Sequence, residues 1–136
     1  MSGSKREKVI REECVICPFK VIHVNINSIQ NKVDELNLIL TEREPDIVCI
    51  SEHHLKKEQL GFVKLGDYQL KAAFCRQKKR RGGSAIFIKE KLETENIGIK
   101  YLNEEGDIEI SAVKIREPDT TVIAMYRPPN GDINFF

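Results

Sequence analysis

The segment 76–81 carries five basic side chains in six positions, a pattern that can bind phosphate. Basic runs attract the phosphate backbone of nucleic acids, and such contacts position a nucleic acid without reading its base sequence. The candidate nucleic-acid-binding residues are Arg76, Lys78, Lys79, Arg80 and Arg81. The formal net charge of the whole chain is only +1, so bulk charge does not indicate a nucleic-acid-binding protein. A solvated loop is the alternative interpretation, and the run alone favours it.

Two cysteines have the spacing of a metal or redox motif. Cys14 and Cys17 form a C-x-x-C pair, as in half of a zinc site or in a thiol redox motif. No second C-x-x-C or H-x-H pair follows at a suitable distance. We therefore do not favour a metal or redox role for this pair. Cys49 lies inside an apolar run and is interpreted as a core residue.

The elements that must position any reactive side chain begin with a strand–helix–strand unit. The run Val21–Val24 predicts a short buried strand, and the run Ile47–Ile50 predicts a strand that is buried on both faces. Between them, apolar residues recur with helical spacing at Ile29, Val33, Leu36 and Leu40. Ser28 is a good N-cap for this helix, and Pro45 ends it because the residue before a proline avoids the helical region.

This unit brings two polar side chains to one edge of a sheet. A helical crossover of this length joins parallel strands, whose carboxyl ends lie on the same edge. Asn25 follows the first strand and Glu52 follows the second. Ligands of α/β sheets usually bind beyond the carboxyl ends of the strands, so we expect Asn25 and Glu52 to share a ligand-binding rim. Asn25 as a turn residue and Glu52 as a surface carboxylate are the simpler interpretations.

The second half of the sequence is typical of β-strands. Ser84–Ile88 predicts one strand, and the segments 108–116 and 120–126 predict an antiparallel hairpin. The alternation of apolar residues changes phase near Ala112, which indicates a bulge or an exchange of faces. A parallel start followed by antiparallel strands predicts a mixed β-sheet in an α/β or α+β sandwich.

Length and composition indicate one soluble, globular domain. The 136 residues are 40% hydrophobic and 32% charged, which favours a folded chain with a core over a disordered one. No apolar stretch approaches the length of about 18 residues that a membrane span needs. Residues 1–18 are polar and predict an N-terminal tail without the apolar run of a secretory signal. We therefore expect an intracellular protein, nuclear or cytoplasmic, that is not secreted and binds no membrane.

Five blocks within residues 20–130 carry a resemblance to a known family. They are His23-Val24-Asn25-Ile26-Asn27-Ser28, Asn31-Lys32-Val33-Asp34-Glu35-Leu36, Pro45–Leu55, Gly82–Ile88 and Tyr126-Arg127-Pro128-Pro129-Asn130. In this order they resemble the endonuclease domain of non-LTR retrotransposons, a branch of the endonuclease/exonuclease/phosphatase superfamily. Five blocks in the family's order make the resemblance specific. The retrotransposon branch rests mainly on the second and fifth blocks.

The resemblance implies the four-layer fold of that superfamily, with residues 19–136 as the N-terminal half of a domain whose C-terminal half is absent. It also implies hydrolysis of DNA with a divalent cation, usually Mg²⁺, and no small-molecule cofactor. Glu52 would be the metal-ligating catalytic carboxylate, which agrees with the preference of Mg²⁺ for oxygen ligands. Asn25 would hydrogen-bond the scissile phosphate or support the site, and Tyr126 would donate a hydrogen bond to a phosphate oxygen. The alternative for Tyr126 is a strand aromatic packed in the core.

The sequence also departs from the family's pattern. The second half of the family's domain carries a G-D-F-N strand end and a terminal S-D-H, which handle the nucleophilic water and the phosphate. Gly131–Asn134 looks like the first of these motifs, but it follows Tyr126 too closely and is interpreted as a loop. The pair His53-His54 follows a strand and is interpreted as exposed and solvated, with a loose metal contact by either histidine as the alternative.

One carboxylate without a positioned base makes a poor nuclease, so we expect no activity from this chain alone. Three functions stay open. The chain is an inactive relic of a retrotransposon endonuclease, a nuclease completed by a missing C-terminal half, or a non-catalytic nucleic-acid-binding remnant that uses the segment 76–81. Salt-dependent DNA binding without cleavage would favour the last of these.

Overall fold

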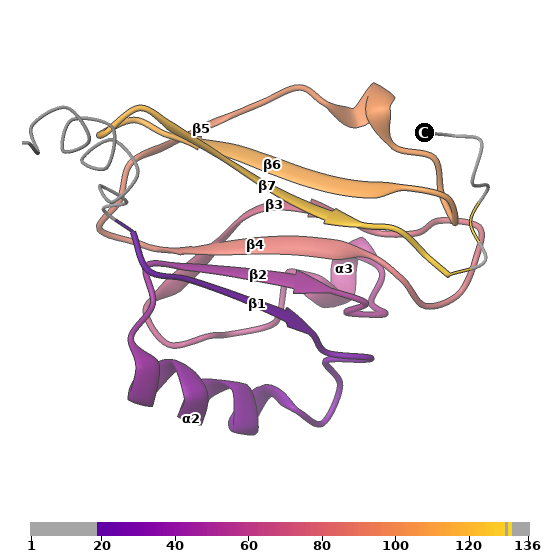
Figure 1. The fold of residues 1–136 in the computed structure, drawn as a ribbon. Helices are drawn as coiled ribbons and strands as arrows, with labels where there is room; N and C mark the ends of the chain where they lie inside the picture. The colour runs from indigo at the N-terminus through magenta and orange to yellow at the C-terminus, as the bar shows by residue number, and fades with distance from the viewer. Residues whose placement is uncertain (1–18, 130, 132–136) are drawn as a thin grey trace, which may run out of the picture.

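Two β-sheets stacked face to face form the centre of the computed structural model, which describes residues 19–129 and 131 (Figure 1). The predicted N-terminal tail with Cys14 and Cys17, and Asp132 and Asn134 of the G-D-I-N segment, lie outside the described residues. None of the helices in the described part of the chain has the length and apolar character needed to cross a membrane.

The first sheet has four strands in the order β1-β2-β4-β3, and the second has three in the order β5-β6-β7. The strands of the first sheet are β1 (Val21–Asn25), β2 (Ile47–Ser51), β3 (Tyr68–Phe74) and β4 (Ser84–Lys89). Those of the second sheet are β5 (Thr94–Asn96), β6 (Glu109–Ile115) and β7 (Thr120–Tyr126). The helices are α2 (Val33–Arg43), the single-turn α3 (Lys57–Leu60) and the 3-10 turn η1 (Lys100–Leu102). Helix α2 covers the face of the first sheet that points away from the second (Figure 1).

The predicted strand–helix–strand unit is confirmed, because β1 pairs in parallel with β2 and α2 connects them. Two details of the prediction are wrong. The helix begins at Val33 and not after Ser28, since Ser28 and Asn31 adopt left-handed backbone angles (φ 84° and 66°) that break a helix. Strand β1 is not buried, because it lies at the edge of the sheet and every second residue is exposed.

The antiparallel partners of β2 complete a mixed sheet, as predicted. Strand β4 pairs with β2 in antiparallel register, and β3 pairs with the other side of β4. The sequence did not predict β3, because the register shifts between Leu70 and Ala72 and so the strand lacks a regular alternation of apolar residues.

The predicted hairpin of β6 and β7 is confirmed. Of the two explanations given for the change of phase near Ala112, a bulge or an exchange of faces, the bulge is wrong. The register runs without a shift from the pair Glu109–Tyr126 to the pair Ile115–Thr120. Both faces of β6 are buried. One face packs on the first sheet, and Ile110 and Ala112 on the opposite face are only 8% and 6% exposed. The change of phase in the sequence therefore reflects burial of both faces.

Two hydrophobic cores hold the layers together. One lies between α2 and the first sheet and contains the fully buried Phe87 of β4. The other lies between the two sheets and contains Cys49, Ile86 and Val113. Cys49 is a core residue as predicted, and burial raises the pKa of its thiol to about 11. These packed layers give the strand ends fixed positions, which is what a site built from loops and strand ends requires.

Candidate active site

Asn25 and Glu52 meet at the carboxyl edge of the first sheet, as the topology predicts. The Asn25 Nδ2 group donates a hydrogen bond of 2.6 Å to Glu52 Oε2. The backbone of Glu52 is left-handed (φ 58°) and is held on two sides, since its N–H donates to Gly83 O (2.7 Å) and its carbonyl accepts from Ser28 N (2.8 Å). A strained residue held in this way is characteristic of functional sites.

Tyr126 reaches the same carboxylate from the other sheet. It is the last residue of β7, and its hydroxyl faces Glu52 across the pocket. Burial, followed by the hydrogen bond to Glu52 and its negative charge, raises the pKa of Tyr126 to about 12. For Glu52, partial burial acts to raise the pKa, but the contacts with Asn25, Tyr126 and His54 outweigh it and lower the pKa. Glu52 is therefore a carboxylate that accepts from Asn25 and Tyr126, with the His54 ring close by.

His53 is not solvated, which corrects the prediction for the histidine pair. Its side chain is fully buried beneath Gly83, the residue just before β4. The Leu55 N–H donates to His53 Nδ1 (2.9 Å), so this nitrogen carries no proton, and His53 Nε2 donates to Phe74 O (3.0 Å). Desolvation lowers the pKa of His53, which keeps the ring neutral. His53 thus has a structural role, because its side chain connects the segment after Glu52 to the end of β3.

His54 is also largely buried, and it faces the candidate site. Its Nε2 atom lies 3.5 Å from Glu52 Oε1, and its side chain is 13% exposed. This nitrogen makes no hydrogen bond within the described part of the chain. Desolvation, together with the positive charges of Arg81 and Arg76, lowers the pKa of His54 in spite of the opposing effect of Glu52, so a neutral ring is favoured near pH 7. His54 therefore offers an unused polar atom beside the carboxylate.

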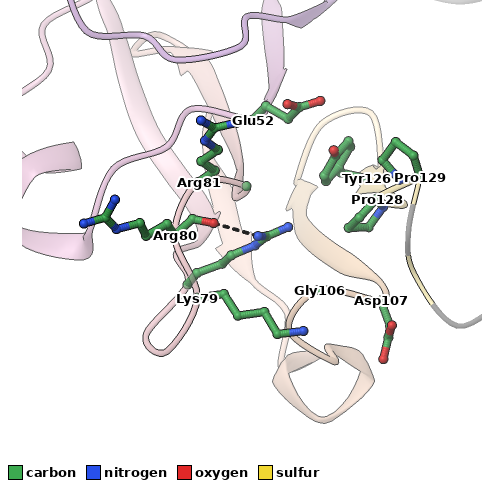
Figure 2. A pocket seen from close by; sticks show the side chains of 11 residues that line it. Glu52, Lys79, Arg80, Arg81, Gly106, Asp107, Tyr126, Pro128 and Pro129 are labelled. Atoms are coloured by element: carbon green, nitrogen blue, oxygen red, sulfur yellow. Dashed lines mark hydrogen bonds between the residues drawn. The ribbon is translucent and has the colours of Figure 1, made fainter.

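A pocket of about 340 Å³ connects these residues with the basic segment (Figure 2). Its walls are made by the end of β2, the β3–β4 loop, the β5–β6 connection and the end of β7. They consist of Glu52, Arg76, Lys79, Arg80, Arg81, Gly82, Gly106, Asp107, Tyr126, Pro128 and Pro129. Four of the five predicted nucleic-acid-binding residues thus line the pocket, while Lys78 is exposed outside it.

The most buried carboxylate of this region, Glu109, was not singled out from the sequence. Its side chain is fully buried and accepts hydrogen bonds from Arg76 Nε (2.5 Å), Gly83 N (2.7 Å) and Gly106 N (2.9 Å). Arg76 also donates from Nη1 to Arg80 O (2.8 Å), the contact drawn in Figure 2. The Arg76 guanidinium is therefore turned inward, unlike the exposed side chains of Lys78 to Arg81.

Comparison with known proteins supports the fold. No family model matches the sequence, and no curated protein matches it significantly. Among solved structures, the chain is similar to an AP endonuclease from Archaeoglobus fulgidus, with a TM-score of 0.55 and 23% sequence identity. The similarity covers 79% of this chain and 40% of that chain, so this chain spans less than half the length of its structural neighbour. The predicted fold class is confirmed: the chain has a mixed α/β architecture, with a mixed four-stranded sheet and an antiparallel sheet, that is similar to part of the fold of this AP endonuclease.

Proposed function

We propose that this chain provides the cation-binding and phosphate-binding edge of a metal-dependent DNA endonuclease. The observation that carries the proposal is the convergence of Asn25 and Tyr126 on the Glu52 carboxylate, which lines a pocket rimmed by basic side chains. These three residues come from two sheets, and the role of each stays a prediction. The likeness of the fold to an AP endonuclease supports a nuclease.

The side chains that could ligate a metal at Glu52 fit a hard divalent cation. Residues 19–129 and 131 contain no group of three or more His, Cys, Asp or Glu side chains placed to hold a metal. Mg²⁺ is nevertheless often held by one or two carboxylates together with substrate phosphate and water. The Glu52 side chain is 22% exposed at the pocket, and the unused Nε2 of His54 lies beside it. When bound, the ion would polarise a phosphoryl oxygen as a Lewis acid.

The other residues would hold the site and the substrate. Asn25 fixes the orientation of the Glu52 carboxylate through its 2.6 Å hydrogen bond, which supports a positioning role. The raised pKa of Tyr126 keeps its hydroxyl protonated near pH 7, and this single O–H, which is hydrogen-bonded to Glu52 here, would turn to a phosphate oxygen when substrate binds. Lys79, Arg80 and Arg81 line the pocket and would contact the phosphate backbone.

We further propose that the nuclease is of the retrotransposon type, on the strength of the N-K-x-D-E-L and Y-R-P-P blocks. The first block starts the α2 segment, and the second continues from β7 into the pocket wall at Pro128 and Pro129. The G-D-F-N and S-D-H motifs, which handle the nucleophilic water and the phosphate in the family, have no counterpart in the sequence of residues 19–129 and 131. We therefore expect the chain alone to bind DNA and not to cleave it.

Mg²⁺-dependent DNA binding tests the proposal. The affinity of the chain for a fluorescent DNA duplex, measured by anisotropy at constant ionic strength, should increase about tenfold with Mg²⁺ relative to chelator, as expected for one bridging charge-assisted contact. Mg²⁺ acting only as a counterion would weaken binding, so the sign of the effect is decisive. Glu52→Gln should abolish the increase. Glu90→Gln, at an exposed position just beyond the far end of β4, should retain it. A decrease with Mg²⁺ in the unmodified chain would contradict the proposal.

A plasmid-nicking assay tests the absence of cleavage. The purified chain with Mg²⁺ should nick supercoiled plasmid no faster than the Glu52→Ala variant or the unmodified chain with chelator. Circular dichroism must show that both proteins are folded. Mg²⁺-dependent nicking that Glu52→Ala abolishes would show that the chain contains a complete catalytic site, and His54 would then be the first candidate for the missing base.

A non-catalytic nucleic-acid-binding module is the second candidate function. The observation that favours it is the set of exposed basic side chains of the β3–β4 loop. Salt-dependent DNA binding that is insensitive to Mg²⁺ and to Glu52→Gln, but lost when Arg80 and Arg81 are neutralised, would support this function.

A further inference from the structure

The β3–β4 loop is basic, yet its backbone is organised by an acidic residue. The Glu105 carboxylate accepts hydrogen bonds from three successive backbone N–H groups, those of Gln77 (2.8 Å), Lys78 (2.9 Å) and Lys79. Successive N–H groups that converge in this way form an anion-binding concavity. Partial burial acts to raise the pKa of Glu105, but these three donors and the positive charge of Lys56 together outweigh it and lower the pKa. The carboxylate is therefore ionised near pH 7.

Three backbone carbonyls of the loop are held from other directions. Lys56 Nζ donates to Arg76 O (2.7 Å) and Lys79 O (3.2 Å). Arg76, itself paired with the buried Glu109, donates to Arg80 O. The loop is thus closed by contacts to its N–H groups on one side and to its carbonyls on the other. Its basic side chains, by contrast, stay exposed from Lys78 to Arg81.

We propose that Glu105 is a positioning residue for nucleic-acid binding, which holds the basic loop in the shape that presents Lys79, Arg80 and Arg81 to phosphate at the Glu52 pocket. This inference rests on the proposed function, because it takes nucleic-acid phosphate as the ligand of the loop. A preformed loop binds more tightly, since the entropy of ordering its backbone is lost on folding and not on binding.

The proposal predicts an effect opposite in sign to that of simple electrostatics. Glu105 is a negative charge beside a phosphate-binding loop, so its neutralisation should strengthen DNA binding if charge alone mattered. A carboxylate that merely occupied the N–H concavity in competition with phosphate would act in the same direction. A carboxylate that holds the loop acts in the opposite direction, because its loss frees the backbone of residues 77–79.

The experiment compares the unmodified 136-residue chain with Glu105→Gln and Glu104→Gln, using anisotropy of a fluorescent DNA duplex. Glu104 is the matched control, because it is adjacent, carries the same charge and is exposed. Glu105→Gln should bind about tenfold more weakly, as expected if the ordering of one or two residues moves to the binding step. Glu104→Gln should bind equally well or slightly more tightly. Amide hydrogen exchange should show that Gln77, Lys78 and Lys79 are protected in the unmodified chain and lose protection in Glu105→Gln alone.

Three other results would contradict either the positioning role of Glu105 or the proposed function. Equal or tighter DNA binding by Glu105→Gln, with circular dichroism unchanged, would overturn the positioning role and leave the proposed function intact. Unprotected amides of residues 77–79 in the unmodified chain would overturn it without recourse to any variant. No DNA binding by the unmodified chain would contradict the proposed function itself, and the positioning role would fall with it.

Discussion

Replacing Glu109 with alanine is expected to lower the free energy of unfolding by about 3–5 kcal/mol, the loss typical of a buried ion pair that is deprived of one partner. The Glu109 side chain is fully buried and accepts from Arg76 and from the backbone N–H groups of Gly83 and Gly106. Alanine would remove the acceptor of Arg76 Nε and of the two N–H groups, and it would leave the guanidinium, which is only 11% exposed, without its counter-charge. Urea denaturation followed by circular dichroism measures the effect.

A surface ion pair of the same chain provides the control for this prediction. Glu95 lies 3.3 Å from Arg116 at the exposed side of the second sheet, where both side chains are about half exposed. Glu95→Ala should change the free energy of unfolding by no more than about 1 kcal/mol, because solvent screens such pairs. If Glu109→Ala were no more destabilising than Glu95→Ala, the buried contacts of Glu109 would not hold the β3–β4 loop to the second sheet.

A double substitution separates the charge from the packing. Arg76→Met combined with Glu109→Leu removes both charges and keeps apolar volume, and replacing a buried pair in this way is often neutral or stabilising. We expect the double variant to recover part of the loss caused by Glu109→Ala. The two unpaired N–H groups of Gly83 and Gly106 would remain, so recovery should be incomplete. The double variant should also bind DNA more weakly, because Arg76 no longer holds the carbonyl of Arg80.

The meeting of Asn25 and Glu52 was predictable from the sequence because it depends on local rules. A strand–helix–strand unit of this length joins parallel strands, and the carboxyl ends of parallel strands share an edge. Tyr126 was reached only through the resemblance to a family. Its place beside Glu52 depends on how the second sheet stacks on the first, and no periodicity in one strand determines the packing of another sheet.

The sequence did not predict the burial of Glu109 and His53, because that burial depends on contacts with residues far away in the chain. Glu109 alternates with Ile108 and Ile110, which is the pattern of a solvent-facing residue, but Arg76 and two glycine N–H groups from other segments make its burial possible. His53 follows a strand among polar neighbours, but it is buried because Gly83 leaves room above its ring. In both cases the partner lies far away in the sequence.

Gly83→Ala is expected to lower the free energy of unfolding by about 2–4 kcal/mol, from the combined effects of backbone strain and overpacking. Gly83 adopts φ +96°, a conformation that residues with a Cβ rarely adopt, and a Cβ at this position would lie 2.4 Å from His53 Nε2. The imidazole cannot retreat without breaking its hydrogen bonds to Leu55 N and Phe74 O. Either the ring or the β4 backbone must therefore shift.

The same substitution should disturb the candidate site, because Gly83 O accepts from the N–H of Glu52 (2.7 Å). Gly98→Ala is the matched control: a Cβ at this position would meet no atom within 4 Å, so the change should be neutral or stabilise by about 0.4–1 kcal/mol. We expect Gly83→Ala, and not Gly98→Ala, to reduce both the urea midpoint and the Mg²⁺-dependent part of DNA binding. Equal urea midpoints for the two variants would mean that the backbone just before β4 can shift to accommodate a methyl group at little cost. Glu52 would then be held less firmly than its hydrogen bonds indicate.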